Sequence, residues 1–294
     1  MYGQLLFNTI VTGFLLALVA VGFNLIFNTT KVFHLAHGAL YVIGAYALLQ
    51  FMEMFNVSNT VTVVLALTGS LIVIALIAVL IEKLIYQPLS KKKASQAISL
   101  ISSVGIYIFL INLIALLYGN ETKFVDPHLG SSFSLVGLTI VPIQLVQLIV
   151  SVILIGSILL FTKTKWFLKV RAMISEETVA SVLGVNTKAI RIWTMAIGSI
   201  LAGIAAILHL FDTGMDPHRG MTITLSAAVA VIIGGKGSVK GTVLASLLIA
   251  FLQTATEWFI SAQWKEGMTF LLLILVILWR TEGIVSFKMR VEEK

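Results

Sequence analysis

The most informative candidate residues lie in a long polar stretch, KVRAMISEETVASVLGVNTKAIRIW, which runs from Lys169 to Trp193. Ser175 is a favourable N-cap, and Glu176 and Glu177 would place negative charge in the first turn of a helix. Gly184 can adopt the left-handed conformation that ends a helix. We therefore expect a two-turn helix from about 175 to 184.

The spacing of apolar residues gives this short helix one apolar face. Val179, Val182 and Leu183 stand at positions i, i+3 and i+4, which share a face of a helix. Such a stripe on a polar loop favours binding in the groove of a partner protein. The alternative is a surface helix that rests on the membrane or on its own bundle.

A second group of polar and small residues falls inside apolar segments. A polar side chain in hydrocarbon costs free energy unless it faces a partner or water. The candidates for a substrate pathway are Asn24, His37, Gly38, Tyr41, Gly44, Thr222, Thr224 and Ser226. The glycines could instead allow close helix packing, and the histidine and hydroxyl groups could bond to backbone carbonyls.

Patterns typical of enzymes and of metal or nucleotide sites do not occur. His34 and His37 stand at i and i+3, but no third ligand is near, so we expect no metal site. The pair Gly235 and Lys236 is followed by glycine rather than by the Ser or Thr of a phosphate loop. The glycine-rich stretch around this pair predicts a tight turn. The GxSxG and HExxH motifs are absent. We predict that the chain is not an enzyme and binds no cofactor itself.

The composition is that of a membrane protein. Of 294 residues, 59% are hydrophobic and 11% are charged, and the mean hydropathy is +1.04. A soluble domain usually carries about 25% charged residues. The chain has no cysteine, so it has no disulfide framework. We expect one membrane domain over residues 1–294.

The apolar segments predict an all-α bundle of about nine membrane spans. They fall at about 4–27, 35–55, 61–85, 97–118, 139–162, 190–211, 221–235, 241–260 and 268–286. The segment 221–235 is shorter than the roughly 20 residues that a straight span needs, so it could be a buried half-helix. Eight crossings remain possible.

The basic residues predict the orientation. If the gap from Lys83 to Lys93 is cytoplasmic, alternation through nine spans places 17 of the 20 basic residues inside. Only Lys123, Arg219 and Lys265 fall outside. The positive-inside rule then predicts an external N-terminus and a cytoplasmic C-terminus. It also makes the loop at about 163–190 cytoplasmic, and the net charge of +7 reflects this topology.

An inverted repeat is compatible with nine spans. The segments FLLALVAVGFNLIF (Phe14 to Phe27) and SILAGIAAILHLF (Ser199 to Phe211) share small-residue spacing, and each leads into a polar turn. Any two apolar helices share some spacing, so this symmetry is a hypothesis. If it holds, the substrate route lies near mid-membrane where the halves meet.

Four blocks of sequence, in order along nearly the whole chain, resemble the membrane subunits of branched-chain amino-acid ABC importers. They are FHLAHGALYVIGAY, RAMISEETVASVLGVNTKAIR, AAVAVIIGGKGSVKGTVLAS and LLILVILWRTEGI. Permeases for urea and short amides look similar. The chain departs from the family pattern in its extra histidine near His37 and in Lys236, which stands where the family has an apolar residue.

The resemblance implies a permease that works with several partners. These are a second homologous permease subunit, two cytoplasmic ATPases that bind ATP, and an extracytoplasmic solute-binding protein, all at the cell inner membrane. The residues that would contact the ATPase are Glu176, Glu177, Ala180, Leu183 and Gly184. A branched-chain or other small amino acid is the expected substrate, with urea or a short amide as the alternative. An ATP-independent channel or secondary carrier is a further alternative, although no buried acidic cluster is present to use a proton gradient.

Overall fold

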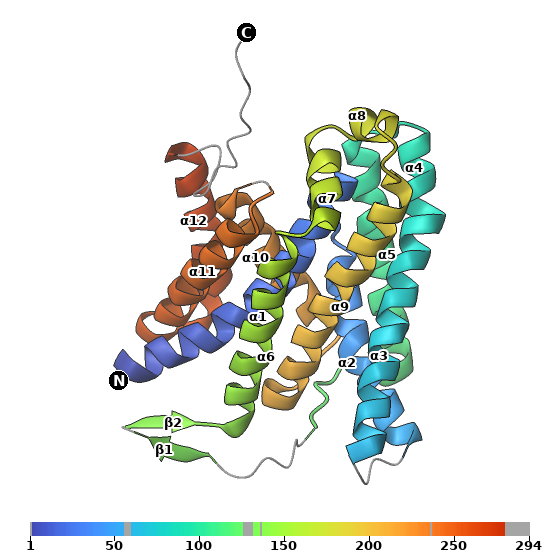
Figure 1. The fold of residues 1–294 in the computed structure, drawn as a ribbon. Coiled ribbons are helices and arrows are strands. Elements are labelled where there is room, and N and C mark those ends of the chain that lie inside the picture. Colours follow the sequence, from blue (N-terminus) through green and yellow to red (C-terminus); the bar gives the residue numbers. More distant parts are fainter. Residues whose placement is uncertain (1, 56–59, 126–131, 136, 236, 280–294) are drawn as a thin grey trace.

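The computed structural model describes residues 2–55, 60–125, 132–135, 137–235 and 237–279. Nine apolar helices form its body: α1 (Tyr2–Thr30), α2 (His37–Met54), α3 (Thr60–Ile81), α5 (Gln96–Tyr118), α6 (Pro142–Phe161), α9 (Thr187–Thr213), α10 (Arg219–Gly234), α11 (Val239–Phe259) and α12 (Lys265–Trp279). Shorter elements connect them: the π-helix η1 (Glu82–Tyr86), α4 (Gln87–Lys91), α7 (Lys165–Ser175), α8 (Glu177–Val182) and the 3-10 turn η2 (Ala262–Trp264). The predicted all-α helical bundle is confirmed (Figure 1).

The described residues contain seven helical segments that are long and apolar enough to cross a membrane. They contain α1, α3, α5, α6, α9, α11 and α12. Helix α10 has 16 residues, which at 1.5 Å per residue span about 24 Å, less than a bilayer's hydrocarbon core of about 30 Å. The prediction of an unusually short segment at 221–235 is therefore confirmed. Together with α2, which has 18 residues, these helices agree with the prediction of about nine spans.

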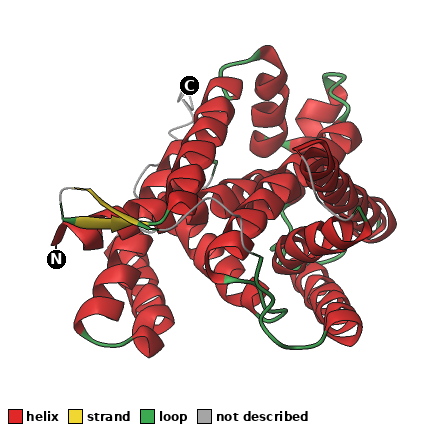
Figure 2. Ribbon diagram, turned by 90° about the horizontal axis from the view of Figure 1, so that it is seen from below, coloured by secondary structure: helices red, strands yellow, loops and turns green. Residues whose placement is uncertain are grey.

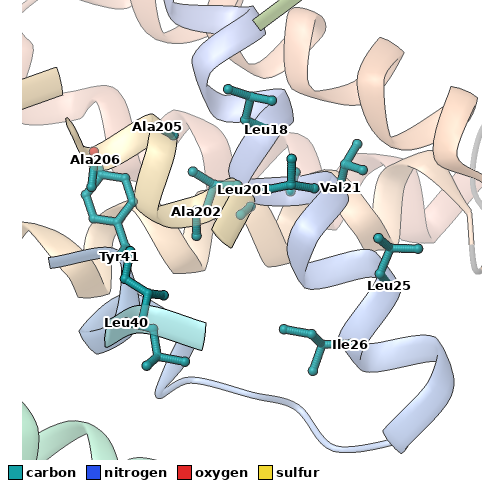
Figure 3. Packing of buried hydrophobic residues seen from close by; sticks show 14 of the residues in the cluster. Leu18, Val21, Leu25, Ile26, Leu40, Tyr41, Leu201, Ala202, Ala205 and Ala206 are labelled. Atoms are coloured by element: carbon teal, nitrogen blue, oxygen red, sulfur yellow. The ribbon is translucent and has the colours of Figure 1, made fainter. Parts of the chain in front are cut away.

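Helices α1 and α9 form the centre of the bundle. The most apolar 18-residue window of α1 is 78% buried and that of α9 is 72% buried, whereas the window of α12 is 6% buried. Helix α1 crosses the bundle obliquely (Figure 1). Figure 3 shows why the packing is close: Tyr41 of α2 and apolar side chains of α1 gather around the leucine and the small alanines of α9. Small side chains let these helices approach without a large energetic penalty.

The connecting elements separate to the two ends of the bundle. Figure 1 places α4, α7 and α8 at one end, together with the C-terminal end of α12. Lys31, directly after α1, reaches the same end, because its Nζ donates to the carbonyl oxygen of Ile174 at 3.0 Å. We call this the loop end. Its basic residues belong to the gaps predicted to be cytoplasmic, and the assignment of this end to the cytoplasm stays a prediction.

A small hairpin, absent from the predicted elements, lies at the opposite end. Strands β1 (Phe133–Leu135) and β2 (Leu138–Ile140) pair antiparallel. They lie beside the N-terminus, where the Gln4 side chain both donates to the Thr139 carbonyl and accepts from the Thr139 backbone nitrogen (Figure 2). The predicted apolar segment 139–162 therefore divides into β2 and α6, which begins at Pro142. Strands of three residues leave too short an apolar alternation to be recognised from sequence.

Candidate coupling surface and translocation route

The short helix α8 lies in the predicted loop, but it begins later than predicted. Ser175 is the last residue of α7, and the N-cap position of α8 is Glu176, whose φ of −154° and ψ of 107° break the helix. The prediction that Ser175 caps this helix is wrong. The reason is that α7 buries Phe167, Val170 and Met173 along one face, which extends that helix to Ser175. Gly184, with φ of +82°, does adopt the left-handed conformation after α8.

The apolar stripe of α8 faces outward. Val179 is 54% exposed, Val182 83% and Leu183 75%, whereas Ala180 is 1% exposed and anchors the helix to the bundle. The stripe therefore does not rest on its own chain. A run of three exposed apolar side chains on a helix at the loop end, beside the basic loops, is a surface suited to a partner protein.

A buried ion pair lies behind α8, and sequence reasoning missed it. Arg191 Nε donates to Glu82 Oε1 at 2.7 Å, and the two side chains are 4% and 0% exposed. Arg191 was interpreted only as one of the basic residues that set the topology, and Glu82 lies within the predicted apolar segment 61–85. The residue pattern holds no indication that they meet, because 109 positions separate them.

His37 begins α2 and is fully buried. Its Nε2 lies 3.3 Å from the Val19 carbonyl oxygen, and its ring meets that of Phe23 edge-on. His34 Nδ1 lies 2.7 Å from the Tyr86 hydroxyl oxygen. Among the described residues, His34 Nε2 and His37 Nδ1 have no hydrogen-bond partner. Each histidine of this buried pair therefore keeps one ring nitrogen that can still form a hydrogen bond.

The glycines of the predicted pathway are sites of backbone contact between helices. A Cβ atom at Gly38 would overlap the carbonyl oxygen of Gly220 in α10, and would lie 2.8 Å from the Thr224 hydroxyl oxygen. At Gly44, a Cβ atom would lie 2.8 Å from the Cα of Gly203 in α9. Thr224 is fully buried, and its hydroxyl has no partner among the described residues. The contact between α2 and α10 thus closes the bundle at the level of Gly38.

The structure divides the predicted pathway residues into two groups. His37, Gly38, Tyr41, Gly44 and Thr224 are buried along α2 and the facing side of α10. The others lie toward α11 and α12. Asn24 Nδ2 bonds to Thr242 Oγ1 at 2.5 Å, Ser226 accepts from Gln253 at 3.3 Å, and Thr222 is exposed in a small hollow beside Glu266.

The bond made by Asn24 predicts a loss of stability when it is removed. Asn24→Leu should lower the free energy of unfolding by about 1 kcal/mol, because Thr242 in α11 and Asn28 lose their buried partner. Asn112→Leu is the matched control, since Asn112 is exposed and its Nδ2 donates within its own helix, to the carbonyl oxygen of Ile108. Unfolding followed in detergent compares the two; equal stability in both variants would contradict a structural bond at Asn24.

The second half of α2 borders open space. A cavity of about 240 Å³ lies between α2, α3 and α5, and its polar groups include Gln50 and Tyr118, which are hydrogen-bonded at 2.8 Å. An entirely apolar groove of about 390 Å³ lies between α3, α6 and α9. Helix α2 therefore contacts the backbone of α10 near His37 and borders an open hollow on the side of Gln50. A route along α2 would require α2 and α10 to separate at Gly38.

Comparisons with known proteins agree with this architecture. The family model described as "Branched-chain amino acid transport system / permease component" matches residues 5–277. The chain is 29% identical to the high-affinity branched-chain amino acid transport system permease protein BraD of Pseudomonas aeruginosa, over 97% of this chain and 96% of that protein. It is 28% identical to the corresponding permease protein LivH of Escherichia coli K12, over 96% of this chain and 95% of that protein.

A solved structure shares the fold. The structure described as PsaBC from Streptococcus pneumoniae in complex with Fab superposes with a TM-score of 0.52, covering 97% of this chain and 92% of the other, at 12% identity. At that identity the likeness extends to the arrangement of helices.

Proposed function

Because this chain belongs to the family of branched-chain amino acid transport permeases, we propose that it forms the membrane-spanning path of an ATP-driven importer for a branched-chain or other small amino acid. The observation that carries this proposal is similarity to the BraD and LivH permeases over nearly the full length of the chain. The weakly polar interior supports it, since an amino acid with an apolar side chain suits a path with few fixed charges.

The energy enters this chain through α8. Its outward apolar stripe is the surface that docks an ATPase subunit, with Glu176, Glu177, Leu183 and Gly184 at the contact. Ala180, predicted from the sequence to join this contact, is 1% exposed and instead holds α8 on its own bundle. Two such ATPases bind the ATP. A second homologous permease subunit completes the path, and an extracytoplasmic binding protein delivers the solute. The loop end faces the cytoplasm, which puts the N-terminus outside and the C-terminus inside.

Transport follows from alternate packing of α2 and α10. In the conformation described, the backbones at Gly38 and Gly220 are in contact and the route is closed. A push on α8 reaches α9, which packs on both α1 and α2. Separation of α2 from α10 would uncover the unpartnered groups of His37 and Thr224, which can then bond to a passing solute or to water.

The substrate class is tested by competition. In membrane vesicles that contain the complete importer, unlabelled leucine, isoleucine or valine in excess should reduce the uptake of labelled leucine by at least about tenfold. Urea and acetamide should leave uptake unchanged. Absence of ATP-dependent uptake of labelled leucine, together with uptake of labelled urea or acetamide, would reassign the importer to short amides.

A further inference from the structure

The buried pair of Arg191 and Glu82 joins elements that are distant in sequence. Arg191 lies in the first turns of α9, and Glu82 opens the π-helix η1 at the end of α3. Arg191 Nη1 also donates to the Ser90 hydroxyl of α4 at 3.2 Å. A single guanidinium therefore ties together the loop ends of three helical segments.

The guanidinium of Arg191 also faces α8. Glu177, the first residue of α8, has its Oε1 4.0 Å from Arg191 Nη1, and its side chain is 41% exposed. Arg191 thus lies between two carboxylates. The one on α3 is buried and bonded at 2.7 Å, and the one on α8 is partly exposed and more distant.

Neither partner of the buried pair uses its full bonding capacity. Arg191 Nη2 and Glu82 Oε2 are buried and have no hydrogen-bond partner among the described residues. An arginine can donate to two carboxylates and a hydroxyl at once, because its planar guanidinium carries five N–H groups. A lysine offers one compact charge and cannot span the same three partners.

We propose that Arg191 is the positioning residue through which movement of α8 reaches the membrane bundle, with Glu82 and Glu177 sharing its guanidinium. When an ATPase pushes α8, Glu177 closes on Arg191, and the bonds to Glu82 and Ser90 carry the displacement into α3, α4 and α9. Arg191 acts on these helices and does not contact the solute. This role rests on the proposed docking of an ATPase on α8.

A double-mutant cycle in the complete importer tests this role. The variants are Arg191→Lys, Glu177→Gln and the two combined, and the measured quantity is the number of amino acid molecules imported per ATP hydrolysed. Arg191→Lys should lower this ratio by about tenfold. Glu177→Gln as a single substitution should also lower it. The combined variant should import as many amino acid molecules per ATP as Arg191→Lys alone, because both substitutions remove the same interaction, the one between Arg191 and Glu177.

Two further variants separate coupling from folding. Glu82→Gln combined with Arg191→Gln removes both buried charges, so that no lone charge remains to destabilise the fold. This variant should fold and copurify with the ATPase. The number of amino acid molecules that it imports per ATP hydrolysed should nevertheless stay below that of the unmodified chain. Glu257→Gln is the matched control. Glu257 forms an ion pair with Lys265, which was predicted to lie outside the membrane. The Glu257→Gln variant should therefore import normally.

The outcomes are distinguishable. A normal import ratio in Arg191→Lys, or effects of Arg191→Lys and Glu177→Gln that multiply independently while the ATPase stays bound, would overturn the role of Arg191 and leave the proposed function standing. Failure of the unmodified chain to copurify with any ATPase would overturn the proposed function, and this role with it.

Discussion

A single aspartate in place of Val182 is expected to abolish ATP-driven uptake while the permease itself folds normally. Val182 is 83% exposed, so the change removes no packing within this chain. At an apolar docking surface, however, it would bury an unpaired carboxylate, which is strongly unfavourable. Copurification of the ATPase subunits should fall by at least about tenfold.

Ser181→Asp provides the control for this result. Ser181 is exposed on the same short helix but lies off the stripe formed by Val179, Val182 and Leu183. The Ser181→Asp substitution introduces the same charge a few ångströms away from that of Val182→Asp. It should leave both ATPase binding and uptake nearly unchanged. If Val182→Asp binds the ATPase as well as Ser181→Asp does, α8 is not the docking surface.

Valine in place of Gly38 is expected to prevent the bundle from closing. Its Cβ would overlap the carbonyl oxygen of Gly220, which is backbone and cannot rotate away. Forcing α2 and α10 apart should cost about 3 kcal/mol or more, and most of the protein should be lost as aggregate in detergent. Size-exclusion profiles and thermal unfolding of the purified permease measure this effect.

Gly105→Val isolates the cost of the contact from that of adding a valine to a membrane helix. A Cβ at Gly105, in α5, would meet no atom within 4 Å. This variant should keep the profile and the unfolding temperature of the unmodified chain. Equal behaviour of Gly38→Val and Gly105→Val would contradict a closed contact between α2 and α10.

Features with a local cause were predictable from the sequence. The stripe on α8 follows from the helical period, and the turn at Gly184 follows from the freedom of glycine to take a positive φ. The shortness of α10 followed from the length of its apolar run. The start of α8 was predicted wrongly, because the cap preference of Ser175 was weaker than the buried apolar face that continues α7 through it.

Features that depend on distant partners could not be predicted in this way. Asn24 was recognised as polar and intramembrane, but its bond to Thr242 joins positions 218 apart. The glycines Gly38 and Gly44 were seen to allow either a path or close packing. Only their facing residues, Gly220 and Gly203, show that they are points of close packing. Arg191 was explained by the positive-inside rule alone, so nothing in the sequence pointed to its ion pair with Glu82.

ATP-dependent uptake into proteoliposomes tests most directly the claim that energy reaches this chain from another. The permease subunits, the ATPases and the binding protein are reconstituted together, and labelled leucine is followed with ATP on the side of the loop end. We predict accumulation only when ATP and the ATPases are both present. Equal accumulation by the permease without ATPases, with or without ATP, would contradict the account.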